Sequence, residues 1–328
     1  MTPDLTIIIA TYNRPEVLKR ALRTLVVQTH QNWTALVIGD CCDDATGEAV
    51  NSLADARIRY INLPERFGEQ AGPNSVGMAL AETDYVAFLN HDDYWLPDHL
   101  EHGIAALRQT GADIFWARAA LFRQRGLFQD RTFFEAYSES GRTLAGSYHT
   151  KNVYSEPLSA WIMTQSAIQR IGRMRLASEV GVQPLKDLAM RANQLGLTLH
   201  ADDHVSVLKD QVIMRPPMYA NLALYAEPLV QMIEAGQIDD LREKISDDIW
   251  ASEQLGDVAD IHDDLGWGDR MPMADIHAET GINIADLQHR SRARAAAVLQ
   301  TLQARTGEKL ANQPDLGEMV SYARAALK

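Results

Sequence analysis

The sequence predicts an α/β fold in which helices flank a mostly parallel sheet, followed by an all-helical C-terminal extension. Over the first half of the chain, short β-branched and apolar runs alternate with segments of helical periodicity, as in sheets whose parallel strands are joined by helices. After "RPP" at 215–217 the β-branched runs almost disappear, and Ala, Leu, Gln, Asp and Glu predominate. We therefore expect a sheet-containing domain at residues 1–217 and a helical domain or extension at 218–328.

The expected sheet domain begins with alternating strands and helices. Strands are expected at 5–11, 33–40, 58–64, 84–90 and 112–122, and helices at 15–29, 72–83 and 97–111. The first strand, "LTIIIAT", is a continuous apolar run of strand length, and Pro15 then stands at a favourable first helical position. The apolar residues that share one face of this helix are Val17, Leu18, Ala21, Leu22 and Leu25.

The pattern is weaker between residues 123 and 210. From 123 to 160 the sequence is irregular and rich in Gly, Ser, Tyr and Arg, which predicts loops with edge strands. Helical spacing returns at 157–172, and another helix is expected at 183–196, with Gly196 as its stop. Residues 197–209, "LTLHADDHVSVLK", are typical of one or two strands.

Composition and charge narrow the class of protein. Of the 328 residues, 46% are hydrophobic and 23% are charged, as in ordinary soluble globular proteins. The formal net charge of −13 argues against a nucleic-acid partner, which needs clustered Lys and Arg. We find no signal peptide and no apolar run of transmembrane length, and the two cysteines, Cys41 and Cys42, are adjacent, which disfavours a disulfide. A cytoplasmic protein is therefore expected, with peripheral contact at the inner face of the membrane left open.

Polar and acidic residues follow three of the expected strands. "TYNR" follows the first strand, Asp40 follows the second, and "NHDD" at 90–93 follows the fourth. Ligands of open α/β sheets bind at the carboxyl ends of the strands, where these residues are expected. Asp92 and Asp93 repel each other unless a cation, a proton or solvent relieves the charge. A polar turn is one interpretation of "NHDD", but its position favours a binding site for a positive group.

The order of these motifs resembles family 2 of the inverting glycosyltransferases, which have the GT-A fold. The resemblance rests on "TIIIATYNRPEVLKRALRTLVVQTHQNW", "LVIGDCCDDAT", "YVAFLNHDDYWLP" and "PLKDLAMRA", in this order within residues 4–210. It implies a Rossmann-like nucleotide-binding half and transfer of a sugar from a nucleotide-sugar, by preference a UDP-sugar. The implied acceptor is a hydroxyl of a glycan or lipid-linked glycan, as in cell-surface polysaccharide synthesis.

The resemblance also implies a donor side. The donor-binding residues that it implies are Thr11, Tyr12, Arg14, Asp40, Asn74, Asn90 and His91. Tyr12 would lie against the nucleotide base, and Asp40 would accept a hydrogen bond from the uracil imide, because an ionised carboxylate only accepts. Cys41 and Cys42 replace the family's usual Gly and Ser, which puts the turn geometry in question because Cys disfavours a positive φ.

The implied cofactor is a divalent cation, Mn²⁺ or Mg²⁺, at the "NHDD" motif. Asp92 takes the place of the final metal-binding Asp of the family's DxD motif, and Asn90 replaces the first carboxylate. One carboxylate is chemically sufficient, because Mg²⁺ sites often combine one or two carboxylates with substrate phosphates. Further candidate ligands are Asp93 and His204, with His200 as an alternative to His204.

The acceptor side needs a general base, because a sugar hydroxyl is a poor nucleophile until it loses its proton. The resemblance places Asp187 of "PLKDLAMR" in this role, in the first turn of the helix expected at 183–196. A carboxylate at this position is kept ionised by the helix dipole. A capping carboxylate is the simpler interpretation, and Glu179 is the fallback base.

Other functions stay open. A sugar nucleotidyltransferase would need a Gly-rich, basic phosphate loop after the first strand, which "ATYNRPE" does not provide. A catalytically weak scaffold that binds nucleotide-sugars would keep the same fold, and Asn90 and Cys41 favour it. The helical extension could hold the acceptor, form a homodimer or dock a membrane-bound partner, and the sequence does not choose among these or among donor sugars and linkages.

Overall fold

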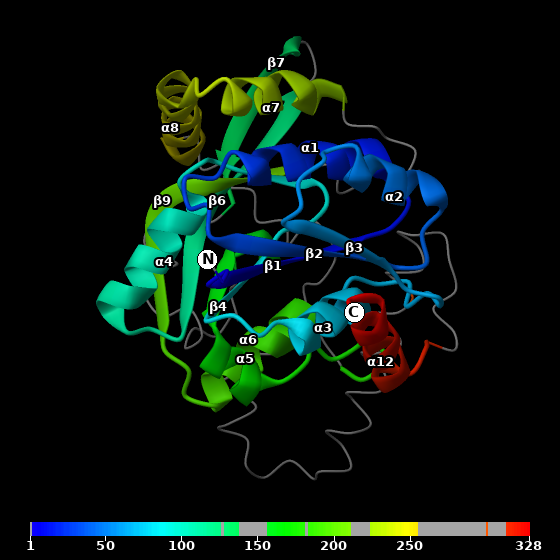
Figure 1. The fold of residues 1–328 in the computed structure, drawn as a ribbon. Helices are drawn as coiled ribbons and strands as arrows, with labels where there is room; N and C mark the ends of the chain where they lie inside the picture. Colours follow the sequence, from blue (N-terminus) through cyan, green and yellow to red (C-terminus); the bar gives the residue numbers. More distant parts are fainter. Residues whose placement is uncertain are drawn as a thin grey trace.

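The computed structural model confirms the α/β class (Figure 1). It describes residues 2–125, 128–137, 156–180, 183–210, 224–254, 300 and 313–328. Within these residues, one mixed sheet of nine strands has the order β3-β2-β1-β4-β8-β6-β9-β5, and β7 pairs with β6. The strands are β1 (Leu5–Thr11), β2 (Trp33–Gly39), β3 (Ile58–Asn62), β4 (Tyr85–Phe88), β5 (Asp93–Trp95), β6 (Ile114–Arg125), β7 (Phe128–Ala136), β8 (Trp161–Thr164) and β9 (Leu199–Asp210).

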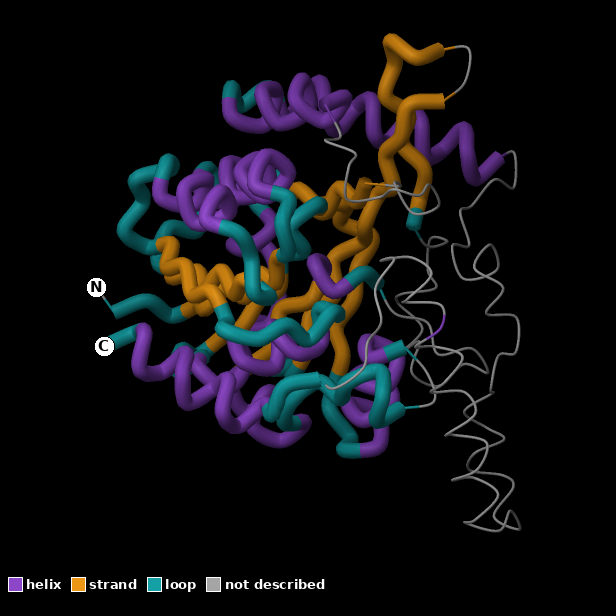
Figure 2. Tube along the Cα trace, turned by 90° about the vertical axis from the view of Figure 1, so that its right-hand side faces the viewer, coloured by secondary structure: helices purple, strands orange, loops and turns teal. Residues whose placement is uncertain are grey.

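Helices cover both faces of the sheet. They are α1 (Pro15–Val26), α2 (Asp44–Asn51), α3 (Ala71–Leu80), α4 (His99–Thr110), α5 (Gln165–Ile171), α6 (Pro184–Gln194), α7 (Glu227–Glu234), α8 (Ile238–Gln254) and α12 (Leu316–Ala326). In Figure 1, α1 and α2 lie on one side of β1, β2 and β3, and α3, α6 and α12 lie on the other. Figure 2 shows the same arrangement from the side, with the sheet between two helical layers.

The parallel part of the sheet brings the carboxyl ends of its strands together. β1 pairs in parallel with both β2 and β4, so that Thr11 lies opposite Gly39. The main chain continues this pairing beyond the strands, since the Asp40 N–H donates to the Thr11 carbonyl over 2.9 Å. On the other side of β1, the Leu89 N–H donates to the Ile8 carbonyl over 3.0 Å. The loops that carry the polar motifs therefore leave from one edge of the sheet, as predicted.

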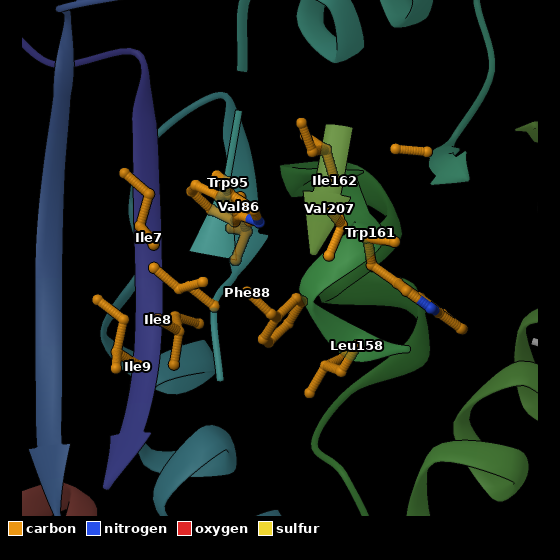
Figure 3. Close-up of a cluster of buried hydrophobic side chains, with 14 of the residues drawn as sticks. Ile7, Ile8, Ile9, Val86, Phe88, Trp95, Leu158, Trp161, Ile162 and Val207 are labelled. Atoms are coloured by element: carbon orange, nitrogen blue, oxygen red, sulfur yellow. The ribbon is translucent and has the colours of Figure 1, made fainter. Parts of the chain in front are cut away.

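Large apolar side chains fill the core on this sheet (Figure 3). The labelled side chains, each at most 1% exposed, are Ile7, Ile8, Ile9, Val86, Phe88, Trp95, Leu158, Trp161, Ile162 and Val207. They come from the strands β1, β4, β8, β9 and β5 and from the 3-10 turn at 158–160. Because helices cover both faces, central strands such as β1 are continuously apolar rather than alternating.

Two expectations of local structure were wrong. The segment 157–172, predicted as helical, contains the strand β8 at Trp161–Thr164, and only Gln165–Ile171 forms the helix α5. β8 is antiparallel to both β4 and β6, in the middle of the sheet. A short buried apolar run such as "AWIM" fits a strand or a helix equally well, so periodicity alone misassigned it. The short strand β5 was also missed, because its partner β9 is distant in sequence.

The described helices beyond residue 217 pack onto the rest of the chain. α7 lies against α1, where Arg20 Nε and Glu227 Oε2 are 3.0 Å apart and Arg23 pairs with Glu227 and Glu234. α8 packs against β7, and α12 packs against α3 on the opposite face. The predicted boundary at 217 falls outside the described residues and stays a prediction. None of the described helices combines the length and apolar character needed to cross a membrane.

Candidate active site

An ion pair joins the loop after β1 to the loop after β4. Arg14 Nη1 donates to Asp92 Oδ2 over 3.0 Å, and the same nitrogen lies 3.5 Å from His91 Nε2. Arg14 directly precedes Pro15, which begins α1, and only 4% of its surface is exposed. The structure therefore brings together three of the residues predicted for the donor and the cation.

The Asp92 carboxylate is ionised and partly open to solvent. Burial alone would raise its pKa, but the neighbouring His91, Lys209 and Arg14 lower the pKa of Asp92 to about 2. Burial also lowers the pKa of His91 below its ordinary value, so we assign the lasting positive charge beside Asp92 to Arg14 and Lys209. The Asp92 side chain is 32% exposed, which leaves it accessible to a ligand.

The donor set at this position fits a divalent cation that is shared with a substrate. Among the described residues, no group of three or more His, Cys, Asp or Glu side chains has the arrangement of a complete metal site. A single ionised carboxylate, Asp92, is a suitable oxygen ligand for Mn²⁺ or Mg²⁺ when phosphate oxygens and water supply the others. The site therefore fits an ion that binds together with a diphosphate and does not fit a cage built from protein alone.

Asp93 is buried and is hydrogen-bonded to other protein side chains, whereas Asp92 is partly exposed to solvent. Its side chain is fully buried and accepts hydrogen bonds from Asn90 Nδ2 over 2.8 Å and from Ser159 Oγ over 2.5 Å. Lys209 Nζ lies 3.4 Å from its other oxygen. Burial raises the pKa of Asp93 although Lys209 acts in the opposite direction. The amide of Asn90, predicted to contact the donor, is thus used to hold Asp93.

Asp187, the predicted base, lies in the first turn of α6 between two arginines. Its Oδ2 is 2.8 Å from Arg191 Nε, and its Oδ1 is 3.3 Å from Arg175 Nη1. The residue is 8% exposed. Glu179, the fallback, is held at 2.6 Å by both terminal nitrogens of Arg173, so neither carboxylate is unpaired.

The part of the site predicted to bind the nucleotide contains a stacked pair that the sequence did not predict. The Arg66 guanidinium carbon lies 3.4 Å from the centroid of the Tyr12 ring. Asp40 accepts hydrogen bonds from the main-chain N–H groups of Phe67 over 2.7 Å and Gly68 over 2.9 Å. Burial raises the pKa of Asp40 to about 6, although these two N–H groups act to lower it. Asp40 therefore anchors the 66–68 loop, and the predicted uracil contact remains a prediction.

The turn after β2 has a backbone conformation with positive φ, which glycine adopts easily. Cys41 has φ of +58°, in the left-handed region, so the residue that replaces the family's Gly adopts a conformation unfavourable for cysteine. The next residue is fixed by Asn62, whose Oδ1 accepts from the Cys42 N–H over 2.7 Å and whose Nδ2 donates to the Cys42 carbonyl over 2.8 Å. Both cysteines are free, as expected.

Two predicted donor-side residues have buried polar atoms without a protein partner. Thr11 Oγ1 and Asn74 Nδ2 are buried and form no hydrogen bond with the described residues. Thr11 ends β1, and Asn74 lies in the first turn of α3, just after the 66–70 loop. A ligand hydrogen bond would offset the cost of leaving such groups unsatisfied.

His204 does not approach Asp92. Its Nε2 lies 2.9 Å from Asp98 Oδ2, and its ring stacks on His102 at 4.2 Å between centroids. Lys209, which contacts Asp93, is five residues further along β9, which corresponds to about 16 Å of strand. His200 is further still along the same strand. The predicted role of His204 as a ligand therefore finds no support in this geometry.

Sequence reasoning also missed residues at the end of β9. Lys209 contributes charge near Asp92, and the following Asp210 is 6% exposed. Burial raises the pKa of Asp210 to about 7, and Tyr225 Oη donates to its Oδ1. A polar "KD" pair directly after the apolar "VSVL" was the available signal, since it marks another strand end at this edge of the sheet.

Comparison with known families and proteins agrees with this geometry. The family model described as "Glycosyl transferase family 2" matches residues 6–172, slightly more than half of the chain. The chain is 34% identical over 117 residues to the succinoglycan biosynthesis protein ExoW of Rhizobium meliloti (strain 1021), which covers 34% of this chain and 37% of that protein. It is 25% identical over 122 residues to UDP-Glc:alpha-D-GlcNAc-diphosphoundecaprenol beta-1,3-glucosyltransferase WfgD of Escherichia coli, covering 37% of this chain and 48% of WfgD.

A solved structure extends the similarity over the whole chain at the level of fold. S. aureus TarS 1–349 in complex with UDP-GlcNAc superposes with a TM-score of 0.54 at 16% sequence identity. The match covers 99% of this chain and 88% of that chain. The chain thus spans a third to a half of the two curated relatives above, while its fold matches most of TarS 1–349.

Proposed function

The chain belongs to glycosyl transferase family 2, and we propose that it is a metal-dependent, inverting sugar transferase. It moves a sugar from a nucleotide-sugar to an acceptor hydroxyl. The observation that carries the proposal is the ionised, partly exposed Asp92 carboxylate, which Arg14 holds at the carboxyl ends of β1 and β4. The function also accounts for the unsatisfied polar atoms of Thr11 and Asn74 on the donor side.

Asp92 and Asp187 have different roles in the proposed reaction. Asp92 would hold the cation, which when bound offsets the negative charge of the leaving nucleoside diphosphate. Asp187 takes the proton of the acceptor hydroxyl, while Arg175 and Arg191 fix the direction of its two oxygens. The hydroxyl oxygen then bonds to the anomeric carbon from the face opposite the diphosphate, and the bond between that carbon and the diphosphate oxygen breaks. This displacement inverts the anomeric configuration.

The substrates that we propose follow the relatives. The name of WfgD specifies UDP-glucose as donor and a diphosphoundecaprenol-linked sugar as acceptor, and TarS was solved with UDP-GlcNAc. ExoW is a succinoglycan biosynthesis protein. We therefore propose a UDP-sugar donor and a lipid-linked glycan acceptor in the synthesis of a cell-surface polysaccharide.

Calorimetric titration of UDP tests the donor site and its cation. Wild-type protein should bind UDP in the presence of Mn²⁺, and EDTA should weaken that binding at least about tenfold. Asp92→Asn keeps the size of the side chain and removes its charge, so it should abolish the effect of Mn²⁺. His204→Ala is the matched control, because His204 lies away from Asp92 and should leave metal-dependent binding unchanged.

The titration also separates the alternatives. UDP binding that is insensitive to Mn²⁺, EDTA and Asp92→Asn would contradict the metal-dependent transferase and favour a nucleotide-sugar-binding scaffold. If His204→Ala removes the Mn²⁺ effect, the cation site must instead include β9 near residue 204. No binding of UDP would contradict the proposed donor and would be followed with GDP and dTDP.

A further inference from the structure

Gln313 connects two loops of the candidate active site from the far end of the chain. Its Nε2 donates to the Phe67 carbonyl over 3.1 Å and to Glu69 Oε1 over 2.6 Å. Its Oε1 accepts from Ser178 Oγ over 2.7 Å. Both sides of the amide are therefore used, the nitrogen by the 66–69 loop and the oxygen by the 176–179 loop.

The position of Gln313 is fixed by the helix that follows it. Asp315 caps α12, since its side chain accepts from the Glu318 N–H over 3.0 Å. α12 packs against α3, and Met319 and Ala323 are buried in the common core. Gln313 lies three residues before α12, so the packing of α12 against α3 fixes its position relative to the two loops.

The 66–69 loop is bound on its other side to the nucleotide region. Asp40 holds the N–H groups of Phe67 and Gly68, and Arg66 stacks on Tyr12. The ring of Phe67 lies so close to Gly72 that a Cβ there would come within 2.1 Å of it. Displacement of this loop would therefore move Arg66 relative to Tyr12.

The 176–179 loop leads to the predicted base. Glu69 accepts from the Ala177 N–H with both oxygens, at 2.9 and 3.1 Å, so the two loops also touch directly. Arg175, the residue just before this loop, has its Nη1 3.3 Å from Asp187 Oδ1. A continuous set of contacts thus runs from Tyr12 and Asp40 through Gln313 to Asp187.

We propose that Gln313 is a positioning residue that couples the 66–69 loop, beside Tyr12 and Asp40, to the 176–179 loop, which leads to the proposed base Asp187. The proposal rests on the proposed function and deepens it, because it gives the C-terminal segment a part in donor binding. Both polar groups of the amide are required, because its nitrogen donates to Phe67 and Glu69 and its oxygen accepts from Ser178. A carboxylate in its place would face the carbonyl of Phe67 and the carboxylate of Glu69 without a proton to donate.

The hydrogen-bonding groups of each variant predict how large its effect should be. Gln313→Ala removes the contacts, whereas Gln313→Glu replaces attraction by repulsion and should have the larger effect. The double variant Gln313→Glu, Glu69→Gln restores a donor opposite an acceptor and should partly recover the wild-type behaviour. Arg324→Ala is the control, because Arg324 Nη2 holds α12 to the Ala79 carbonyl at 3.1 Å without touching either loop.

Hydrogen exchange and UDP titration of the full chain test the coupling together. In Gln313→Ala, the amides of residues 66–69 and 176–179 should exchange at least about tenfold faster, and the dissociation constant for UDP should rise about 5- to 10-fold. Gln313→Glu should exceed both effects, and Arg324→Ala should accelerate exchange only in α12 and α3. Unchanged exchange in either loop, or faster exchange with unchanged UDP affinity, would overturn the coupling.

Hydrogen exchange and UDP titration test the role of Gln313 and the proposed function separately. Faster exchange in both loops of Gln313→Ala, in a protein whose wild type binds no UDP, would overturn the donor assignment and support the contacts of Gln313. Failure of the double variant to recover from Gln313→Glu would overturn the assigned directions of the hydrogen bonds. Recovery would exclude a purely general loss of stability, since the double variant carries more changes than the single one.

Discussion

Arg14 Nη1 lies 3.0 Å from Asp92 Oδ2, so a buried arginine holds the carboxylate that the proposed function assigns to the cation. The arginine side chain is 2% exposed, and the aspartate side chain is 32% exposed. A cation approaching Asp92 from solvent therefore meets an oxygen that is already paired. Under the proposed function, the diphosphate of the donor would supply oxygens to Arg14 and to the cation, so that Arg14 would no longer compete with the cation for Asp92.

Replacing Arg14 should change two affinities in opposite directions. In Arg14→Met, Mn²⁺ alone should bind about tenfold more tightly, because a charge-assisted hydrogen bond no longer competes for Asp92. Binding of UDP with Mn²⁺ should become at least about tenfold weaker, because a partner for the diphosphate is lost. Electron paramagnetic resonance of free Mn²⁺ and calorimetry measure the two affinities.

The control for Arg14 is a second paired arginine, in the turn just before β3. Arg57 Nη2 lies 2.6 Å from Asp55 Oδ2, and Arg57→Met should change neither affinity. If Arg14→Met weakened Mn²⁺ binding and UDP binding alike, Arg14 would be supporting the loop rather than competing with the cation.

Asp187→Asn should remove the chemical step and spare donor binding. The asparagine keeps the volume between Arg175 and Arg191 but cannot take a proton from the acceptor hydroxyl. We expect kcat to fall about 10²- to 10⁴-fold, the usual contribution of a general base. The dissociation constant for UDP should stay within about twofold, as measured by calorimetry on the same preparation.

Glu179→Gln provides the comparison with the fallback base. Glu179 is occupied by Arg173 and by the Leu176 N–H at 2.7 Å, which suits a structural carboxylate. Its replacement should therefore cost less than about tenfold in kcat. A large loss of kcat in Glu179→Gln together with an active Asp187→Asn would exchange the two assignments.

Asp40 should make the stability of the protein depend on pH. Burial raises its pKa from the ordinary 3.8 to about 6, so the folded state favours the protonated form more than the unfolded state does. The stabilisation is complete below about pH 4 and is lost as pH rises through 6, an amount of about 3 kcal/mol. Relative to Asp40→Asn, wild type should lose this amount of unfolding free energy between about pH 3 and pH 7, most of it between the two pKa values.

Urea unfolding of both proteins at a series of pH values measures the difference, and other titrating groups cancel in it. Parallel curves for wild type and Asp40→Asn would show that the carboxyl titrates alike in the folded and unfolded states. A difference of the opposite sign would show that the N–H groups of Phe67 and Gly68 outweigh burial.

The parallel part of the fold was predictable because its signals are local. Continuous apolar runs and Pro15 mark β1 and α1, and the loop after β4 follows from where the apolar run stops. Predicted site residues such as Arg14 and Asp92 lie in the loops that directly follow such strands. Their pairing could be expected from the rule that parallel strands end at one edge of the sheet.

The missed features depend on contacts between distant segments. β5 exists because Asp93–Trp95 pairs with residues 207–209, and no local pattern distinguishes it from a loop. Gln313 reaches Glu69 from 244 positions away, and a polar residue before a helix is most simply read as solvated surface. The burial of Asp93 beside the more open Asp92 could not be predicted, because it depends on Ser159 of the 3-10 turn and on Lys209 of β9.

The predicted boundary at residue 217 can be tested by cutting the chain there. The fragment 1–217 lacks α7 and α8 and leaves Arg20, only 5% exposed in the full chain, without Glu227. The apolar side chains that it loses from the common core are Leu229, Val230, Ile233, Leu241, Ile245 and Ile249. Burial of each contributes about 1.5–3 kcal/mol, and together they match the 5–15 kcal/mol or so by which domains are usually stable.

We therefore expect the fragment 1–217 to lack a cooperative unfolding transition, as followed by near-ultraviolet circular dichroism during heating. The fragment 1–254 keeps α7 and α8 and should unfold cooperatively, although it lacks α12 and Gln313. Cooperative unfolding of 1–217 at the temperature of the full chain would mean that the sheet domain is independent and that α7 and α8 only cover its surface. If the fragment 1–217 shows no cooperative transition, α7 and α8 belong to the domain that carries the sheet. This is the expected result, because α7 packs directly against α1.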